Sequence, residues 1–556
     1  MNANLAGLFY VLCGLGAALL LIRPSFELFY RGFAVWAVSA ILLFGMSGDP
    51  LLVLFGTFIA VLIAAPAQSS ARVAFFLAVA PSLPVTLIGN LSLPGITTLF
   101  GATHYKLAVM ALLLPCLFDR NSAQQKFTLA DGMLIAYAAL TALVFSTFET
   151  GTLALRFFVD QLLVIAVPFL AIRRSIRTSK DLELVMSGFV MASVILACGT
   201  LFATLKQWDF YRLYEPLGAG NISEFRGGFL RIFMTANAHS LGYHLAAAIL
   251  MIEALRLRAP FQFNRMIILY PLFLAGIFFT HSRGAVGGLA LGLVIMVMVR
   301  IPNNALRKLS FAGLFIGGAA AAFQFIQGDV GAIDEYGTFE YRRDLLTTSI
   351  DYILAHPYFG DFTFWGQPEF AHLVQGQGII DITNLYLLIL LYYGVPIGVL
   401  LFAAIAIPFV SLVRRPASFS GGRAAMPVRE TSQRAPRLEP RTTAPHALGR
   451  AFAAAQPANM PRSANEPLFQ RAIARAPNNL RSVDFTVSSS PMNGRADNDM
   501  SGQEELRYRI AARGVLAGCI AGWLFLVVTT SDVGLTMHLG IVLAAIGAAV
   551  SRRDFQ

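Results

Sequence analysis

Residues 266–300 read MIILYPLFLAGIFFTHSRGAVGGLALGLVIMVMVR, so that two apolar runs flank a short polar turn at 281–283. The runs extend over about 266–280 and 284–299. Neither run alternates between apolar and polar residues, whereas a strand of a membrane barrel does alternate. A helix needs about 20 mainly apolar residues to cross the hydrocarbon core of a bilayer. The stretch therefore predicts two membrane-spanning helices joined by a tight turn.

Similar apolar runs recur along most of the 556 residues. Hydrophobic residues make up 56% and charged residues 13% of the chain, whereas soluble domains carry about 25% charge. This composition predicts an all-α, polytopic transmembrane helical bundle of about 12–15 spans. The candidate spans are 5–22, 33–46, 51–67, 73–88, 100–118, 132–148, 156–172, 183–204, 236–255, 266–280, 284–299, 309–327, 385–413, 511–530 and 533–550.

The net charge of +11 comes from Arg and Lys in short loops and in one long polar insert. Loops rich in these residues normally lie in the cytoplasm, which places the turn at 281–283 and the segment 328–384 on the opposite, periplasmic face. The distribution argues against a nucleic-acid partner and favours contact with membrane lipids. The four cysteines lie inside apolar runs and lack the spacing of a metal site or a disulfide framework.

Two long polar segments divide the chain. Residues 414–508 contain fourteen Arg and ten Pro with few large apolar residues, a composition that predicts a disordered cytoplasmic insert. Residues 328–384 contain several aromatic residues and a helix-like run from 341 to 355, and predict a partly helical periplasmic cap. The expected organisation is a transmembrane bundle at 1–327, this cap, a transmembrane helix at 385–413, the insert, and a C-terminal transmembrane hairpin at 509–556.

Polar residues at the outer ends of the spans are candidates for function, because lipid makes them costly to keep. Arg283 has a fork of donors suited to phosphate oxygens, although an Arg at a helix end also commonly extends toward the headgroups. Asn237 could cap a helix, and His239 could be a satisfied interhelical histidine. Arg156 and Asp160 have the i,i+4 spacing of a structural ion pair.

The cap contains the candidates for acid–base chemistry. Glu369, His372 and Asp381 could each accept a proton from a hydroxyl group, and each could equally be a solvated loop residue. The chain has no Gly-rich phosphate loop, CxxC pair or HExxH motif. We therefore expect neither a cofactor nor a metal ion.

Four motifs resemble those of the O-antigen ligase and polymerase superfamily. In chain order they are Thr-Ala-Asn-Ala-His at 235–239, Ser-Arg-Gly-Ala-Val-Gly-Gly at 282–288, Arg342 or Arg343 before His-Pro-Tyr-Phe-Gly at 356–360, and Asn-Leu-Tyr-Leu at 384–387 followed by Tyr-Gly at 393–394. The resemblance covers about 230–410 and implies a metal-independent membrane glycosyltransferase of the bacterial inner membrane. Its expected substrate is an undecaprenyl-pyrophosphate-linked glycan.

The resemblance also implies roles for individual residues. The arginines would bind the pyrophosphate of the donor, and a second set of polar residues would support the arginines. The pyrophosphate-binding candidates are Arg231, Arg283, Arg342 and Arg343, and the supporting candidates are Asn237, His239, His281 and Asn384.

One departure from the family pattern bears on the reaction. Ligases of the superfamily typically have His-Asn or His-Ser just before Tyr-Leu, and that His is their proposed base. In this chain, which resembles them, the position holds Thr383. This favours polymerisation of an O-antigen or exopolysaccharide over ligation, with Glu369, His372 and Asp381 as candidate bases. The alternatives are a ligase, a flippase of lipid-linked oligosaccharide, or a scaffold in which the insert at 414–508 contacts polysaccharide-export proteins. The absence of an internal repeat argues against a transporter.

Overall fold

The computed structural model describes most of the chain between residues 50 and 414 and between 502 and 552. The residues not described within these limits are 84–86, 94–95, 120–124, 208–224, 227–228, 233–236, 259–265, 328–337, 375–379, 381, 383 and 531–534. Before residue 50, only 12, 13, 16, 31, 32, 34, 35, 37–39, 41 and 42 are described. Most of the predicted span at 5–22, half of that at 33–46 and nearly all of the insert at 414–508 thus lie outside the described residues.

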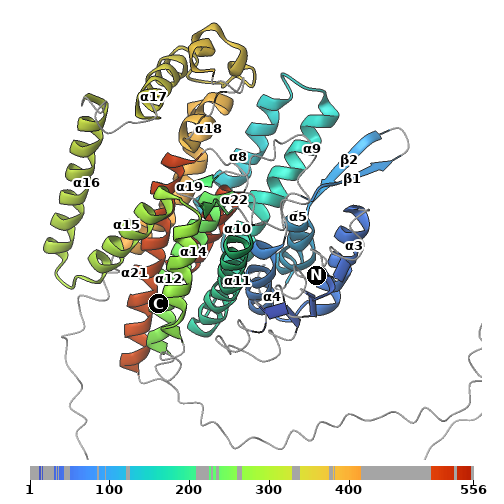
Figure 1. The fold of residues 1–556 in the computed structure, drawn as a ribbon, viewed down its shortest axis with the longest axis vertical. Coiled ribbons are helices and arrows are strands. Elements are labelled where there is room, and N and C mark those ends of the chain that lie inside the picture. Colours follow the sequence, from blue (N-terminus) through green and yellow to red (C-terminus); the bar gives the residue numbers. More distant parts are fainter. Residues whose placement is uncertain are drawn as a thin grey trace, which may run out of the picture. The chain divides into compact units, whose positions relative to one another are not determined.

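The described part of the chain is almost entirely helical, which confirms the predicted all-α fold (Figure 1). Six helical segments in this part are long and apolar enough to cross a membrane, so the chain is a multi-pass membrane protein. They are Gly151–Ser175, Ser179–Lys206, Ala238–Arg258, Arg283–Arg300, Val395–Val413 and Glu504–Thr529. The shorter apolar helices are Pro50–Ala64, His104–Leu117, Leu129–Phe145, Leu269–Phe279 and Thr536–Val550.

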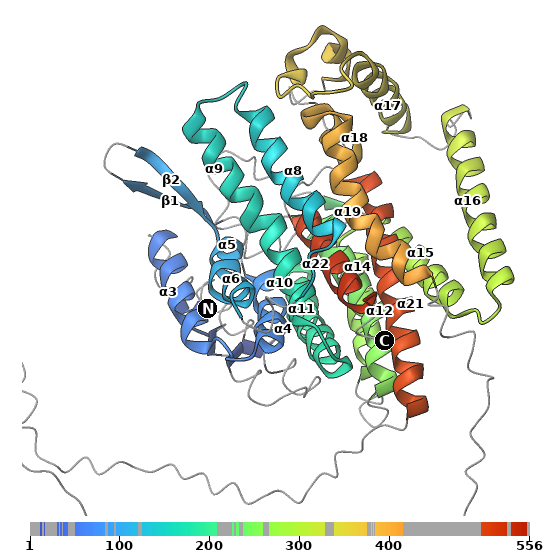
Figure 2. The same ribbon diagram turned by 180° about the vertical axis from the view of Figure 1, so that it is seen from behind.

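The predicted hairpin at 266–300 consists of α14 (Leu269–Phe279) and α15 (Arg283–Arg300). Both helices pack against a third helix, α12 (Ala238–Arg258), which lies beside them in Figures 1 and 2. This helix of 21 residues is about 30 Å long, enough to span the hydrocarbon core. One end of α12 lies beside the turn between α14 and α15, and we call this the turn end.

The most extensive contact between described helices joins α15 to α21 (Gly502–Leu526). Both helices carry glycine at every fourth position where they meet, namely Gly284, Gly288 and Gly292 on α15 and Gly514, Gly518 and Gly522 on α21. A methyl group at Gly288 would lie 2.8 Å from the carbonyl oxygen of Gly522, and one at Gly292 would lie 3.0 Å from that of Gly518. The two backbones can therefore approach closely only because these side chains are absent.

The other end of the bundle, which we call the basic end, is held by ion pairs. Arg258, in the last turn of α12, pairs with Glu183 of α11 (Ser179–Lys206) and with Glu505 of α21. Arg173 of α10 (Val167–Ser175) pairs at 2.5 Å with Asp131 near the start of α8 (Leu129–Phe145), and both side chains are buried. The contacts bring together several of the basic loops that the sequence analysis placed on one face.

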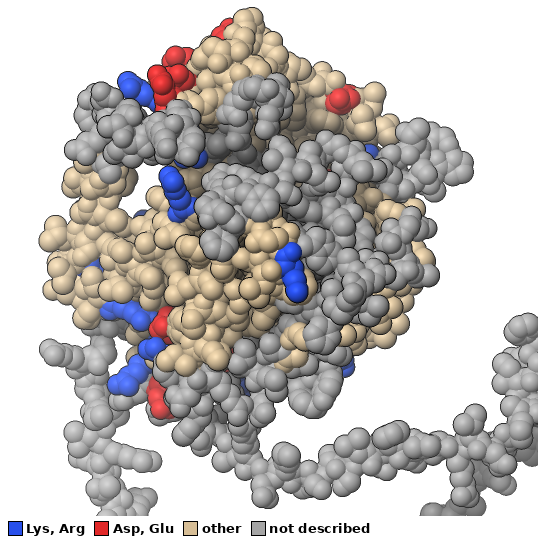
Figure 3. Space-filling model, in the orientation of Figure 1, with Lys and Arg blue, Asp and Glu red and all other residues tan. Residues whose placement is uncertain are grey.

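Charged side chains are few on the face of the molecule shown in Figure 3. The described part of the chain also exposes large apolar side chains, including Phe278, Val297, Leu309 and Phe315. Phe315 belongs to α16 (Asn304–Gln327) and is 78% exposed. Lipid tails solvate such surfaces without cost, so this exposure is the pattern expected of a bundle that spans a bilayer.

The described part of the predicted cap is a small aromatic cluster built on α17 (Thr338–Ala355), which confirms the helix expected at 341–355. The ring of Phe370 contacts those of Tyr352 and Phe364 edge to face, and Phe364 and Phe370 are fully buried. The segments η6 (Phe364–Gly366) and η7 (Pro368–Leu373) supply the two phenylalanines. The cap is thus held by its own core.

Candidate functional site

The turn between α14 and α15 is shaped by a strained residue and a cap. His281 adopts a left-handed conformation with φ of 50°, which few residues other than glycine adopt. Ser282 then caps α15, because its Oγ accepts a hydrogen bond at 3.2 Å from the backbone N–H of Ala285. The predicted tight turn is confirmed. Capping the helix is a structural role for Ser282, and it accounts for a hydroxyl-bearing residue at this position.

Arg231 reaches this turn from a short hairpin of β3 (Phe225–Arg226) and β4 (Phe229–Leu230). Its side chain is only 8% exposed. Its Nε donates to the carbonyl oxygen of Thr280 at 3.3 Å, and its Nη2 lies 3.1 Å from Nε2 of His239. These contacts bring the guanidinium of Arg231 to the turn.

His239 connects Arg231 to Ser282. Its Nδ1 lies 2.9 Å from the Ser282 Oγ, while its Nε2 faces the Arg231 Nη2. Arginine has only donors, so Nε2 must accept and the imidazole proton must reside on Nδ1, from where it donates to Ser282. The expectation of a satisfied interhelical histidine is confirmed. We call Arg231, His239 and Ser282 the outer array.

Two helix N-termini meet at the outer array. Asn237 caps α12, as expected, because its Oδ1 accepts from the backbone N–H of Ser240 at 2.7 Å, and α15 begins directly after Ser282. The N-terminus of a helix carries a partial positive charge and favours anions. Arg283 is the first residue of α15 and is exposed, and its guanidinium makes no hydrogen bond or ion pair with the described residues. The turn end thus combines two helix N-termini with two arginines.

Asn384 lies at the start of a helix that reaches the same end of α21 as this turn. It caps α18 (Leu385–Tyr393) by accepting from the backbone N–H groups of Tyr386 and Leu387 at 2.9 and 3.3 Å. The Tyr386 hydroxyl donates to the carbonyl oxygen of Leu524 at 3.0 Å. Gly284, beside Arg283, packs against Leu526 and Thr529 of the same segment. The structure therefore brings the second and the fourth of the resembling motifs to the end of α21.

The third motif forms a joint with the Tyr-Gly pair at 393–394. The backbone N–H of Asp361 donates to the carbonyl oxygen of Leu391 at 2.8 Å, and that of Val395 donates to Pro357 at 3.0 Å. Gly360 packs directly on the backbone of Tyr392, where no side chain would fit. Gly394 has φ of 80°, a conformation that favours glycine. These residues attach the cap to α18, so the motif has a structural role.

The predicted catalytic residues of the cap are separate from the outer array in the described contacts. Glu369 and His372 are exposed, and Nε2 of His372 lies 3.5 Å from Oγ1 of Thr348. Arg342 is half-buried and Arg343 is exposed, both on α17. Asp381 and Thr383 lie outside the described residues. No described contact joins these side chains to Arg283, and their roles in catalysis and binding stay predictions.

The expected ion pair between Arg156 and Asp160 is wrong. Asp160 pairs instead with Lys106 at 2.9 Å, across the contact between α9 (Gly151–Gln161) and α5 (His104–Ala108). The i,i+4 spacing allowed the first pair, but a basic side chain from another helix reaches the carboxylate in the folded bundle. A single sequence contains no local signal for that choice.

The described residues contain no cluster of His, Cys, Asp or Glu able to hold a metal ion. No family model, curated protein or solved structure matches the chain.

Proposed function

We propose that the chain is a polysaccharide polymerase of the bacterial inner membrane, which extends an undecaprenyl-pyrophosphate-linked glycan at the periplasmic face. The observation that carries this proposal is the turn end. There the outer array holds a buried Arg231 beside the exposed Arg283, at the meeting point of two helix N-termini. Such a concentration of positive charge suits a pyrophosphate group.

The proposed reaction needs little more than this charge and a proton acceptor. The hydroxyl of the acceptor glycan attacks the anomeric carbon of the donor, and the bond from that carbon to the pyrophosphate oxygen breaks. The pyrophosphate leaves with the bonding electrons, so that negative charge develops on it in the transition state. Fixed donors aimed at developing charge lower the barrier, and in our proposal Arg283 and Arg231 supply these donors.

The proton of the attacking hydroxyl must pass to a base. The His239 Nε2 already accepts from Arg231, so this imidazole serves to orient the array. Glu369, His372 and Asp381 remain our proposed bases, and a carboxylate or imidazole must lie within hydrogen-bond reach of the hydroxyl to act. His281, next to Ser282, would hold the turn in its left-handed conformation.

The test uses the purified full-length chain in proteoliposomes that contain an undecaprenyl-pyrophosphate-linked oligosaccharide. We expect a ladder of longer lipid-linked glycans, which gel electrophoresis and mass spectrometry would detect. Arg283→Lys should remove most of the ladder, because a point charge does not reproduce the two-pronged guanidinium contact. Arg256→Lys, at the opposite end of α12, is the matched control and should leave the ladder intact.

Three other outcomes would contradict the proposal. A full ladder from the Arg283→Lys protein would exclude Arg283 as the pyrophosphate contact. Movement of the lipid-linked oligosaccharide between leaflets without any ladder would indicate a flippase, in which the same cationic site binds the pyrophosphate during transport. Transfer to a lipid A-core acceptor, again without a ladder, would indicate a ligase.

A further inference from the structure

The cap exposes a group of large apolar and aromatic side chains where α17 ends. Ile350 and Leu354 of α17 are 43% and 71% exposed, and Tyr358 and Phe359, just beyond the helix, are 73% and 68% exposed. We call these four residues the apolar edge. Exposed groups of this kind usually mark a surface that contacts a partner or a membrane.

The apolar edge occupies its own side of α17. Leu345 and Ile353, on the side that packs in the cap, are only 1% and 8% exposed. Ile350 and Leu354 are four residues apart and so lie on one side of the helix. A further side is polar and exposed, and its residues are Asp344, Thr347 and Asp351. An exposed apolar side beside a polar side is also found in helices that lie at a bilayer surface.

The length of α19 (Val395–Val413) sets the depth at which the cap is attached. Its 19 residues extend over about 28 Å, close to the hydrocarbon thickness of about 30 Å. At the basic end, Arg513 Nη2 donates to the carbonyl oxygens of Ser411 and Arg414 at 2.9 and 2.7 Å. Charged side chains avoid the hydrocarbon, so this end of α19 lies at one boundary of the bilayer. Val395, one membrane thickness away, then lies at the opposite boundary.

The apolar edge is attached to the bundle at this opposite boundary. The ring of Tyr386 on α18 contacts that of Phe402 on α19, with 4.5 Å between centroids. Helix α18 therefore runs back along α19, and Gly394 forms the tip between them. A methyl group at Gly394 would lie 2.6 Å from the carbonyl oxygen of Tyr358 and 3.0 Å from Cα of Phe359. These contacts fix Tyr358 and Phe359 beside the tip, and Figure 1 shows the cap at the same end of the molecule as α18.

We propose that the apolar edge lies in the interface between the acyl chains and the headgroups of the bilayer, and that it anchors the cap to a phospholipid surface. Tyrosine is enriched at this depth, because its ring is apolar and its hydroxyl is polar. The apolar surface continues inward along α19, where Val399, one turn beyond Val395, is 54% exposed. The anchor does not depend on the proposed polymerase activity.

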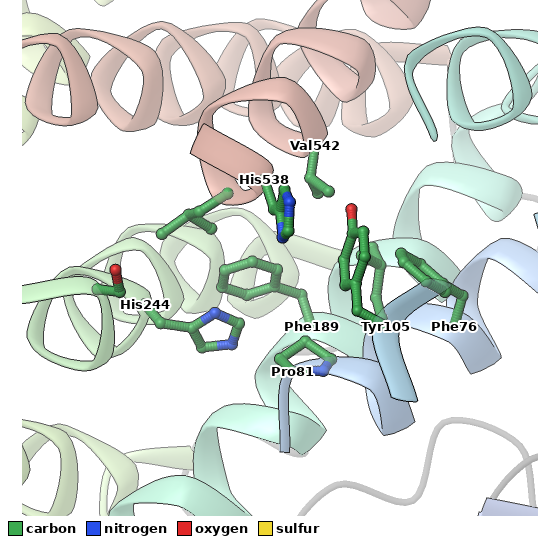
Figure 4. A pocket seen from close by; sticks show the side chains of 10 residues that line it. Phe76, Pro81, Tyr105, Phe189, His244, His538 and Val542 are labelled. Carbon is green, nitrogen blue, oxygen red and sulfur yellow. The ribbon is translucent and has the colours of Figure 1, made fainter. Parts of the chain in front are cut away.

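One cavity inside the bundle is too small for a lipid chain. It lies among α4 (Ser69–Val79), α5, α11, α12 and α22 (Leu535–Val550) and has a volume of about 50 Å³ (Figure 4). A benzene ring needs about 150 Å³, so an acyl chain does not fit there. The lining residues are Phe76, Leu77, Pro81, Tyr105, Phe189, Ser240, His244, His538, Leu539 and Val542.

Photo-crosslinking of the full-length protein in proteoliposomes made only of phospholipid tests the anchor. The photoreactive residue p-benzoylphenylalanine, placed at Phe359 or at Leu354, should form several-fold more phospholipid adduct than at Thr347. Thr347 is the matched control, because it is exposed on the polar side of the same helix. Mass spectrometry of the intact protein measures the adducts.

Two results of this experiment would overturn the proposal. The first is an equal yield of phospholipid adduct at all three positions, or no adduct at Phe359. The second is a cross-linked protein dimer in place of lipid adducts, which would assign the apolar edge to a second copy of the chain.

Hydrogen–deuterium exchange in nanodiscs provides an independent measurement. The double variant Leu354→Ser, Phe359→Ser changes only exposed side chains and leaves the aromatic core of the cap intact. Without the anchor, the backbone amides of α17 should exchange several-fold faster than in the wild type. Thr347→Ser with Asp351→Asn, on the polar side, is the matched control and should exchange at the wild-type rate. Unchanged exchange in the Leu354→Ser, Phe359→Ser protein would overturn the role of lipid contact in holding the cap.

Discussion

The arginines near the two ends of α12 differ in their bonding partners. At the basic end, Arg258 pairs with Glu183 and Glu505, and nearby Arg173 pairs with Asp131. At the turn end, Arg231 bonds to a carbonyl oxygen and an imidazole, and the exposed Arg283 makes no bond to the described residues. Arginines that are paired with acids hold helices together, whereas the exposed Arg283 is available to an anion. The ion pairs of the basic end thus have a structural role, and our proposed function uses the arginines of the turn end.

The largest expected effect of a single substitution is at the basic end. Asp131→Ala leaves the buried Arg173 without its carboxylate, which typically costs about 3–5 kcal/mol. The variant also loses the capping bond from Thr128 N–H to Asp131 Oδ2, which is 2.7 Å long. We expect a sharp fall in folded yield and Tm. The matched control is Asp344→Ala on an exposed face of α17. Similar Tm values for both variants would contradict the structural role.

At the turn end, His239→Ala should destabilise the protein less and impair function more. It removes the acceptor of Arg231 and the donor to Ser282, and a hydrogen bond to a charged group contributes about 1.5–3 kcal/mol. His239→Asn keeps one donor and should restore part of the Tm. The readouts are the Tm and the length of the glycan ladder. His372→Ala, in the cap, should leave the Tm unchanged, and an equal fall in Tm in both alanine variants would argue against a specific structural role of the outer array.

The glycine contact between α15 and α21 connects the two ends. Gly288→Ala would place a methyl group 2.8 Å from both the Gly522 carbonyl oxygen and the ring of Tyr243, and such overpacking typically costs about 1–3 kcal/mol. Gly317→Ala on α16 is the control, because nothing lies within 4 Å of the added carbon. It should be neutral or raise the Tm, since alanine favours a helix by about 0.5–1 kcal/mol over glycine. Equal Tm values would contradict this account of the helix contact.

The smallest expected effect is a change in the stability of the cap with pH. Burial raises the pKa of Asp361, but hydrogen bonds from Thr363, Tyr352 and Gln367 outweigh it and hold the pKa below its usual range. The resulting stabilisation is present above the ordinary aspartate pKa of about 4 and is lost as the pH falls through the lower folded value.

Trp365 fluorescence, followed during acidification, should report loosening of the cap. Its indole N–H donates to the Tyr392 hydroxyl at 2.9 Å, which places it at the junction of cap and bundle. Asp361→Asn should remove most of the pH dependence below about 4. A transition of the same size in the variant would assign it to another group.

Local features of the sequence were sufficient for the predicted helical hairpin, for the cap of Asn237 and for the helix at 341–355. Each depends on residues within a few positions of one another, so hydropathy and backbone hydrogen bonding decide it before any helix packs. The polymerase hypothesis and its site residues also come from local motifs, and they stay predictions because no described contact tests the chemistry.

Tertiary structure decided which distant groups meet. It paired Asp160 with Lys106, joined His239 to Ser282, and gathered Tyr105, His244 and His538 around one cavity. Of these, Tyr105 and His538 gave no sequence signal, because the two rings stack across helices that are far apart in the sequence. Apolar periodicity shows that a helix is buried, but it does not specify the partner. The close approach that glycines permit between α15 and α21 depends on the packing of the whole bundle. The rotation of each surrounding helix about its own axis depends on the same packing.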